Sequence, residues 1–303
     1  MMNRSDFRKQ LQEGLNTVFG LEYEQHPEEW RDIFDVETSS KAYEEDVLMF
    51  GFGAASVKPE GTPIDMDDMG ESWVARYVHE TIALGFAITE EAEEDGLYGS
   101  IGAKGSKALA KSFRHTKEVK GANVLNNGFD TDYPGGDDVP LFSTAHPLAG
   151  GGTLSNTLAT PADLSEAAME ELLVQIGDWT DDRGIPIVVK VKKLIIPTEL
   201  QFIAARLLMT EFQPDSGDNN INAIRKIGAI AEGFAVNHRL TDPDAWFFKT
   251  DQADGLKHFV RKAMSGGVVS EGDFSTGNLR YKKRERYSFG WTDWRGAAGV
   301  PGS

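Results

Sequence analysis

Ser143 and His146 lie three residues apart in a loop that also contains Asp137 and Asp138. A serine, a histidine and a carboxylate are the side chains of a hydrolase triad, in which the histidine takes the serine proton. Ser143 lacks the Gly-x-Ser-x-Gly elbow that exposes the nucleophile in one large class of hydrolases, and its segment is short and bounded by prolines. We therefore interpret this segment as a polar loop with satisfied hydrogen bonds rather than as a catalytic site.

Asp65, Asp67, Asp68 and Gly70 resemble the start of a calcium-binding EF-hand loop. The twelfth position of such a loop supplies a bidentate glutamate, whereas this chain has Arg76 there. The calcium interpretation therefore fails at its most demanding position, and an acidic turn in solvent is favoured.

No other segment has the spacing of a metal or phosphate site. His79, Glu80 and His115 lack a second ligand at helical spacing, which a zinc site on a helix requires. Residues 99–107 are rich in glycine and lysine but do not match the P-loop pattern. The sequence predicts no catalytic residue, no metal and no cofactor, and we expect a protein that is not an enzyme.

The segment from 278 to 294 is the clearest predicted strand. Alternate residues of a strand point to opposite faces. One predicted face carries Arg280, Lys282, Arg284 and Arg286, and the other carries Leu279, Tyr281, Tyr287, Phe289 and Trp291. Cations interleaved with tyrosines are also typical of nucleic-acid-binding surfaces, so a nucleic-acid-binding protein using residues 280–286 is the alternative function.

The composition restricts the partners. The 303 residues include 31 Lys and Arg against 48 Asp and Glu, a net charge of −17 that repels nucleic acid from most of the surface. A solvated or intersubunit face is therefore favoured for the cations at 280–286. The absence of cysteine excludes a disulfide framework. No apolar run is long enough for a membrane span or a signal peptide, and we expect a cytoplasmic product.

Residues 1–39 are expected to form an N-terminal arm. Apolar side chains recur there at helical spacing among charged residues, at Phe7, Leu11, Leu15, Val18 and Phe19. Such a stripe requires a partner surface that the local sequence does not supply. We expect the arm to pack on a neighbouring subunit or under the long helix that follows in the same chain.

Residues 40–88 are expected to form an extended hairpin. Glycines and prolines interrupt short apolar runs up to residue 71, and apolar and polar residues then alternate to Ile88. Loops longer than ~15 residues are usually functional. The acidic residues of this segment, which we expect at the tip of the hairpin, are Asp65, Asp67, Asp68 and Glu71.

Residues 89–127 are expected to form one long helix. Thr89 can cap it, and the acidic run at 90–95 favours the positive end of a helix. Cations follow one another at spacings of three or four, at Lys104, Lys107, Lys111, Arg114 and Lys117. The remaining stripe is narrow and made of small residues, so this helix is expected to lie across another element rather than inside a core.

The rest of the chain predicts a mixed α+β region. Helices are expected from Leu164, with Asp163 as N-cap, and over 199–210, and strands over 185–196, 234–240, 246–250 and 256–263. We place the helix and its following loop in 89–156, a second domain in 157–277, and a strand that returns to the first domain in 278–303.

Three segments resemble the major capsid proteins of tailed bacteriophages, and are most similar to the Mu-like major head subunit group. The first is AYEEDVLMFGFGAASVKPEG with the following ARYVHETIALGFAITEEAEEDGLYG. The second is GGDDVPLFSTAHPLAGGGTLSN. The third is IPIVVKVKKLIIPTELQFIAARLL with the later NNINAI and NHRLTDPDAWFF. The resemblance covers roughly residues 43–248.

The resemblance implies the Hong Kong 97-like capsid fold, with an N-terminal arm, an extended loop, a peripheral domain with a spine helix, and an axial domain. It implies a structural subunit of the virion that assembles with itself, as hexamers and pentamers, into the icosahedral head around double-stranded DNA. Scaffold, portal and decoration proteins are further expected partners, DNA is expected to be held by confinement only, and no membrane is involved. The host bacterial cytoplasm is the expected site of synthesis.

One hypothesis joins the two charged stripes. In the implied arrangement the extended loop of one subunit lies over the spine region of the next. The acidic residues of the hairpin are therefore expected to pair with the lysines and the arginine of the neighbouring long helix. Single exposed pairs contribute only ~0.2–1 kcal/mol, but repetition at every contact of a shell accumulates and fixes the register.

Overall fold

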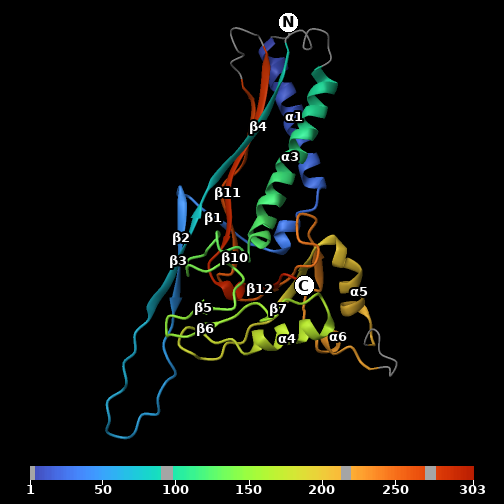
Figure 1. Ribbon diagram of the computed structural model, residues 1–303. Helices are drawn as coiled ribbons and strands as arrows, with labels where there is room; N and C mark the ends of the chain where they lie inside the picture. Colours follow the sequence, from blue (N-terminus) through green and yellow to red (C-terminus); the bar gives the residue numbers. More distant parts are fainter. Residues whose placement is uncertain (1–3, 90–97, 213–219, 270–277) are drawn as a thin grey trace.

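The computed structural model describes residues 4–89, 98–212, 220–269 and 278–303 (Figure 1). A narrow part is built from a long sheet and two long helices, and a broad part from a second sheet and short helices. A hairpin protrudes from the side of the broad part. The mixture of helices and strands confirms the predicted α+β class.

The long sheet has the strand order β1-β10-β11-β4. Its members are β1 (Asp35–Thr38), β10 (Leu256–Val269), β11 (Leu279–Trp291) and β4 (Glu80–Ile88). β1 pairs with β10 in parallel, and the other pairs are antiparallel. The predicted alternation of β11 is present, since Tyr281 and Tyr287 are buried while Lys282 and Arg284 are exposed.

Helices α1 (Arg4–Gln25) and α3 (Tyr98–Asn126) pack on one face of this sheet. At ~1.5 Å per residue, α3 is ~44 Å long. A Cβ on Gly105 would lie 2.9 Å from the ring of Phe86 on β4, so the small residues of α3 allow the helix to approach the sheet closely. The predicted acidic helix start at 90–95 lies outside the described residues.

The protruding hairpin consists of β2 (Tyr43–Phe50) and β3 (Gly70–Val78), joined by a loop at 51–69. The predicted hairpin over 40–88 is therefore too long, because β4 pairs with β11 instead. The chain changes sheets at His79, whose Nδ1 lies 3.0 Å from the Ser288 hydroxyl and whose Nε2 lies 2.8 Å from the Ser39 hydroxyl.

The broad part contains a second sheet with the order β12-β9-β7-β8. Its strands are β12 (Ala297–Val300), β9 (Trp246–Thr250), β7 (Val191–Ile196) and β8 (Phe234–Val236). Both faces of this sheet are buried: one face contributes Leu194, Trp246 and Phe248 to one cluster, and the other contributes Ile195 and Phe247 to a second. Short helices lie beside this sheet: α4 (Glu166–Gly177), η2 (Thr198–Leu200), α5 (Gln201–Met209) and α6 (Ala223–Ile227).

Three details of the broad part differ from the sequence prediction. The N-cap of α4 is Ser165, which accepts the N–H of Ala168, and Asp163 instead accepts the N–H of Ser303. β10 belongs to the long sheet, so the second domain does not extend over the end of 157–277. β12 belongs to the second sheet, so 278–303 contributes to both parts. Strand pairing over long distances in sequence decides these boundaries, and local pattern does not report it.

Candidate intersubunit surfaces

The segment around Ser143 forms a buried hydrogen-bond network. His146 is fully buried, with Nδ1 2.7 Å from the carboxylate of Asp137 and Nε2 3.1 Å from Oδ1 of Asn156. The Ser143 hydroxyl accepts the N–H of Ala145 and is bonded by neither ring nitrogen. A serine without a base is not a nucleophile at neutral pH. This geometry agrees with the interpretation of the segment as a polar loop.

Asn156 is the centre of this network, and the sequence analysis did not single it out. Its Nδ2 donates to the carbonyls of Leu141, Ala297 and Trp294 at 2.7, 3.0 and 3.3 Å. It thereby joins the loop to β12 and to η3 (Trp294–Gly296). The asparagine of the TLSN motif was the only sequence signal.

The structure also bears on the metal, phosphate and membrane interpretations that the sequence raised. Among the described residues, no three or more histidines and carboxylates are arranged to hold a metal ion. The glycine- and lysine-rich segment lies inside α3 from Tyr98 onward, where no phosphate-binding loop exists. Within the described part of the chain, no helix combines the length and apolar character of a membrane span.

The loop at 51–69 exposes apolar side chains that no described part of the chain covers. Val57 is 94% exposed and Met66 is 86% exposed. Phe52, Ile64 and Met69 are exposed as well. Large apolar side chains gathered on a protruding segment mark a surface that another molecule covers.

The acidic residues lie on the returning side of this loop rather than at its tip. The tip is the turn at Pro59–Thr62, where Gly61 has φ +80°. Asp67 accepts the N–H of Gly53 at 2.6 Å and pairs with Arg183 at 3.3 Å. The backbone N–H groups of Gly53 and Asp68, which both bond to Asp67, lower the pKa of its carboxyl group.

The other loop carboxylates have fewer partners. Among the described residues, Asp65 accepts a hydrogen bond from the Ser56 hydroxyl alone. Glu71 is the second residue of β3 and lies opposite Met49, so it is part of the hairpin strand and not of a tip. Asp65, Asp68 and Glu60 are therefore the exposed carboxylates that remain available to a partner.

The basic stripe of α3 divides into two groups. Lys104, Lys107 and Lys111 are exposed, and the last two lie 3.7 and 3.5 Å from the carboxylate of Glu22 on α1. Arg114 is buried, where it pairs with Glu28 and also donates to the carbonyl of Tyr23.

Lys117 is also buried, 3.6 Å from Glu285 on β11. Burial lowers the pKa of Lys117 and raises that of Glu285. The prediction that Arg114 and Lys117 meet a neighbouring subunit is therefore wrong, because both side chains are enclosed within their own chain.

The arm stripe packs partly on the chain's own long helix. Leu15 and Phe19 are buried against Leu109 and Phe113 of α3 and Tyr281 of β11. Val18 is half-buried. The side chains of Phe7 and Leu11 lie outside the described residues.

The arm continues into η1 (Glu29–Asp32), which meets α3 at a buried carboxyl group. Glu118 is 3% exposed, and one of its oxygens accepts the N–H of Trp30 at 2.9 Å. Its other oxygen is buried without a partner. Burial raises the pKa of Glu118 to about 7, so a neutral carboxyl group fits this joint better than a charged one.

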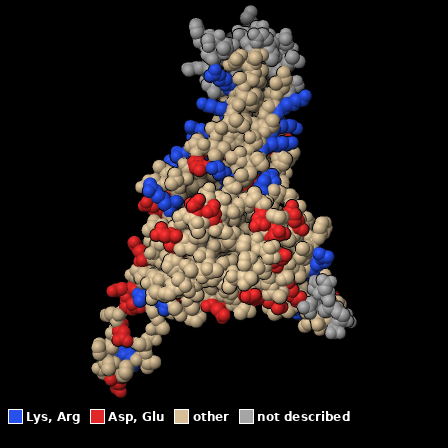
Figure 2. Space-filling view, in the orientation of Figure 1, with Lys and Arg blue, Asp and Glu red and all other residues tan. Residues whose placement is uncertain are grey.

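The face of the long sheet opposite the helices is basic. β11 presents Lys282 and Arg284 there, with the partly buried Arg286 next in the same row, and β10 adds Lys262. Figure 2 shows Lys and Arg side chains projecting from both flanks of the narrow part, while Asp and Glu dominate the broad part and the hairpin. We call the four cations Lys262, Lys282, Arg284 and Arg286 the open basic face.

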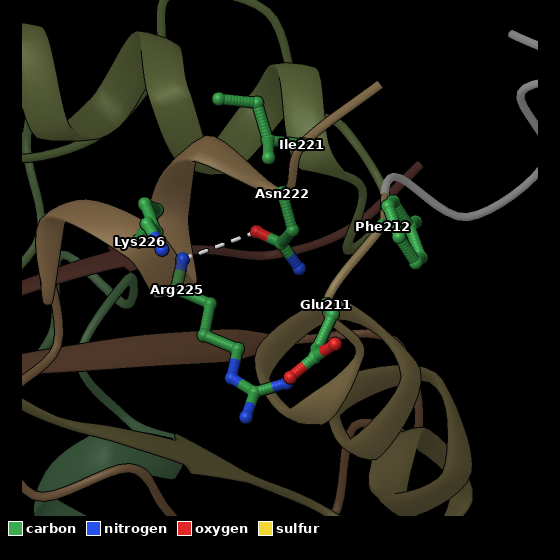
Figure 3. A pocket seen from close by; sticks show the side chains of 6 residues that line it. All are labelled: Glu211, Phe212, Ile221, Asn222, Arg225 and Lys226. Carbon is green, nitrogen blue, oxygen red and sulfur yellow. Dashed lines mark hydrogen bonds between the residues drawn. The ribbon is translucent and has the colours of Figure 1, made fainter. Parts of the chain in front are cut away.

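A further exposed surface lies at the corner of the broad part, around a pocket of about 400 Å³ (Figure 3). Phe212 and Ile221 form an isolated antiparallel bridge beside it, and both are exposed. Asn222 caps α6 by accepting the N–H of Arg225 at 3.1 Å. The pocket has no catalytic constellation, and its exposed apolar side chains are suited to a protein contact.

Solved structures share this fold. The capsid of a native GTA particle aligns with a TM-score of 0.57 at 13% identity, over 91% of this chain and 90% of that chain. The Microbacterium phage Oxtober96 structure gives 0.53 at 12% identity, over 90% of each chain. A virus-like particle from Pyrococcus furiosus gives 0.52 at 8% identity, over 95% of this chain and 98% of that chain. At these identities the likeness establishes the fold, which is the predicted Hong Kong 97-like capsid fold.

No curated protein matches the sequence. The family model described as phage capsid protein matches residues 74–300, which is most of the chain and includes α3, the strands from β4 to β12 and the Asn156 network. The protruding hairpin and the exposed surfaces described above are the features that a subunit of a shell requires. The chain belongs to the phage capsid protein family.

Proposed function

We propose that this chain is the major capsid protein of a tailed phage, a structural subunit that assembles with copies of itself into the head shell. The observation on which this proposal rests is the loop at 51–69, which protrudes from the body and exposes apolar side chains that the described residues of its own chain leave uncovered. Membership of the phage capsid family supports the same function. Heterologous contacts repeated around a ring give closed assemblies, and a protruding loop supplies such a contact.

The sequence alone assigned the loop to the basic stripe of the neighbouring long helix. That pairing stays a prediction, restricted to the lysines that α3 leaves exposed: Lys104, Lys107 and Lys111. On the loop, Asp67 is bonded within its own chain, so Glu60, Asp65 and Asp68 are the better candidates.

Particle formation tests the proposed function. The purified chain is expected to sediment as capsomers or shells and to show rings or particles in negative stain. Replacing residues 54–66 by a short turn should abolish particles while the circular dichroism spectrum and melting temperature stay close to those of the unchanged chain. Val188→Ser, at an exposed position of the body, is the matched control. A monomer that binds duplex DNA in a salt-sensitive manner would instead support the nucleic-acid-binding alternative.

Finer features of the proposal come from the sequence resemblance. They are membership of the Mu-like major head subunit group, synthesis in the cytoplasm of the host bacterium, and a place in the virion. Scaffold, portal and decoration proteins would be the further partners. Packaged DNA would be held by confinement, as expected for a chain with a net charge of −17.

A further inference from the structure

A pocket of about 450 Å³ lies where the arm, α3 and the broad part meet. Its walls are the end of the arm, one side of α3 and the segment that follows β8. Six of its lining side chains are basic: His26, Lys111, Arg114, His115, His238 and Arg239. The volume is in the range of small-ligand sites, ~300–1,000 Å³. None of the described hairpin residues lines this pocket, so it is separate from the surface that supports the proposed function.

The lining of this pocket carries more positive than negative charge. Its acidic members among the described residues are Glu29 and Glu118. One oxygen of Glu29 accepts the N–H of His238 at 2.9 Å, and the other lies 2.7 Å from Nδ1 of the same residue. Burial raises the pKa of Glu118 to about 7, so this carboxyl group carries less than a full negative charge at neutral pH. The two arginines and the lysine of the lining therefore exceed its negative charge.

Two of the basic side chains have no partner in the described part of the chain. His115 is exposed and Arg239 is half-buried, and neither forms an ion pair or a side-chain hydrogen bond with a described residue. Nε of Arg239 is buried without a hydrogen-bond partner, as is Nε of Arg114. Lys111 and Arg114, in contrast, each have a carboxylate partner outside the lining. Arg239 and His115 therefore remain available to bond a ligand.

Hydrogen bonds join the walls of the pocket to one another. At the end of α3, Nδ2 of Asn126 donates to the carbonyl of Arg239 at 3.0 Å, and Oδ1 of Asn126 accepts the N–H of Thr241 at 3.1 Å. On the arm side, Glu118 accepts the N–H of Trp30 at 2.9 Å. These bonds hold the arm, α3 and the segment after β8 in fixed relative positions. A site that is already ordered loses less entropy when it binds a ligand.

Hydrogen-bond donors of this kind fit an oxyanion. Lysine and arginine side chains only donate, and a neutral imidazole still has one N–H to donate. Arginine bonds phosphate oxygens through two parallel N–H groups. A metal ion is disfavoured, because the described residues contain no group of three or more histidines and carboxylates that would hold one. A long polyanion is disfavoured by the acidic residues of the broad part (Figure 2). A small anion with several charges is therefore the best fit.

We propose that this pocket binds a small anion with two or more phosphate groups, which joins the arm, α3 and the broad part of one subunit. Arg239 and His115 bond the phosphate oxygens, and Lys111 and Arg114 supply further positive charge. The bound anion stabilises the position of the broad part relative to the arm and the helix. Binding takes place within a single chain, so it does not depend on assembly into a shell.

Isothermal titration of the purified chain with tripolyphosphate, at constant ionic strength, tests the assignment. The variant R239Q/H115Q removes the two side chains without partners, and the control R206Q/K104Q removes two exposed cations outside the pocket. The pocket variant should bind at least about tenfold more weakly, because charge-assisted hydrogen bonds are lost. The control should stay within about twofold of the unchanged chain, since distant exposed charges are screened. No binding by the unchanged chain, or equal losses in both variants, would overturn the proposal.

Hydrogen exchange shows where the anion binds. Tripolyphosphate should slow exchange in residues 26–32 and 237–241, which flank the pocket, and leave the loop at 51–69 unchanged. Unchanged exchange in both flanking segments would place the bound anion elsewhere and refute the assignment. A short DNA duplex at equal phosphate concentration should fail to displace tripolyphosphate, and displacement would refute the restriction to small anions. Neither measurement requires particles, so a failure of the proposed shell function is distinguishable from a failure of this site.

Discussion

At the residue scale, buried ionisable groups gather where the arm, α3 and the long sheet meet. Burial and the nearby Lys117 lower the pKa of His258 to about 3, so this histidine stays neutral beneath Trp30. Glu118 has the opposite shift, because its burial raises the pKa. The contact between the arm, α3 and the long sheet thus favours the uncharged forms of His258 and Glu118. We therefore expect the stability of this contact to depend on pH.

Substitution of Glu118 by glutamine isolates one of these contributions. The pKa of Glu118 is about 7 in the folded chain, against the ordinary value of 4.5 that applies when the chain is unfolded. The neutral carboxyl group of Glu118 contributes its full stabilisation when the pH is below the pKa of the unfolded chain. This contribution is lost as the pH rises through about 7, the pKa of the folded chain. Chemical unfolding at pH 5 and pH 8 should show that Glu118→Gln removes roughly 2–3 kcal/mol of the decrease seen in the unchanged chain. An unchanged pH slope would show that Glu118 is charged throughout.

The charged residues of α3 illustrate what sequence spacing can determine. The spacing placed five cations along one helix, and three of them are exposed as expected. Arg114 and Lys117 are buried because Glu28 and Glu285 offer partners there. Glu285 is distant in sequence and lies on the predicted strand face that holds Tyr281 and Tyr287. A pattern within one helix carries no information about such a partner.

At the element scale, the arm depends on α3 for its position. Leu15 is 3% exposed in the cluster with Phe19 and Phe113, whereas Leu21 on the same helix is 59% exposed. Leu15→Ala should lower the free energy of unfolding by about 2–5 kcal/mol, since a cavity forms. Leu21→Ala should change it by less than about 0.5 kcal/mol. Equal effects in urea unfolding would mean that the arm does not pack on α3 in solution.

The hairpin is held to the long sheet by Lys257. Its ammonium group lies 2.5 Å from Asp46 on β2 and 2.7 Å from Asp254. Burial lowers the pKa of Lys257, but hydrogen bonds to Asp254 and Asp46 outweigh that effect and raise it overall. This buried cation thus contributes to the orientation of the hairpin relative to the body, together with the hydrogen bonds of Trp73 and Tyr77 on β3 to Thr292.

Lys257→Met should destabilise the chain by roughly 1–3 kcal/mol, less than a fully buried pair because the carboxylates are partly exposed. It should also increase hydrogen exchange in β2. Lys262→Met is the control on the same strand, since Lys262 is exposed and has no ion pair among the described residues. Similar stabilities of the two variants would contradict the role given to Lys257.

An element could be predicted well where neighbouring residues in the sequence determine it, and poorly where a distant strand partner does. Strand β9 was predicted with its exact bounds, and β11 with small shifts. The end of α3 was predicted within one residue, whereas its predicted start at 89–97 is not covered by the described helix. The division at His79 was missed because both flanking segments alternate and were taken as one run, although their apolar positions change from odd numbers, ending at Tyr77, to even numbers, beginning at Ile82. The change of partner from β2 to β11 occurs at this same point.

At the scale of the whole molecule, charge limits contact with nucleic acid. The net charge of −17 opposes DNA, and the open basic face is too small to reverse the field. Free subunits should bind duplex DNA no more tightly than ~10⁻⁴–10⁻⁶ M at physiological salt. Fluorescence anisotropy at several salt concentrations measures this; submicromolar affinity with a steep salt dependence would favour the nucleic-acid-binding alternative.

The arrangement of the whole fold came from the resemblance and not from residue patterns. No local signal places β1 beside β10, since the two strands are contributed by opposite ends of the chain, or β12 beside β9, since β10 and β11 lie between them in sequence. Likewise the open basic face was visible as an alternation in β11, but its border of small residues on β4 appears only in the folded register.

The strand order of the long sheet has a consequence for the timing of synthesis. Strands β1 and β4 leave the ribosome early, and their partners β10 and β11 are made more than 150 residues later. Contacts of such long sequence separation form slowly and only when both partners exist. A nascent chain therefore cannot complete this sheet until β11 has been made. Until then β1 and β4 have no strand partners from this sheet and stay exposed to aggregation, and ordered polymerisation through the completed sheet can begin only afterwards.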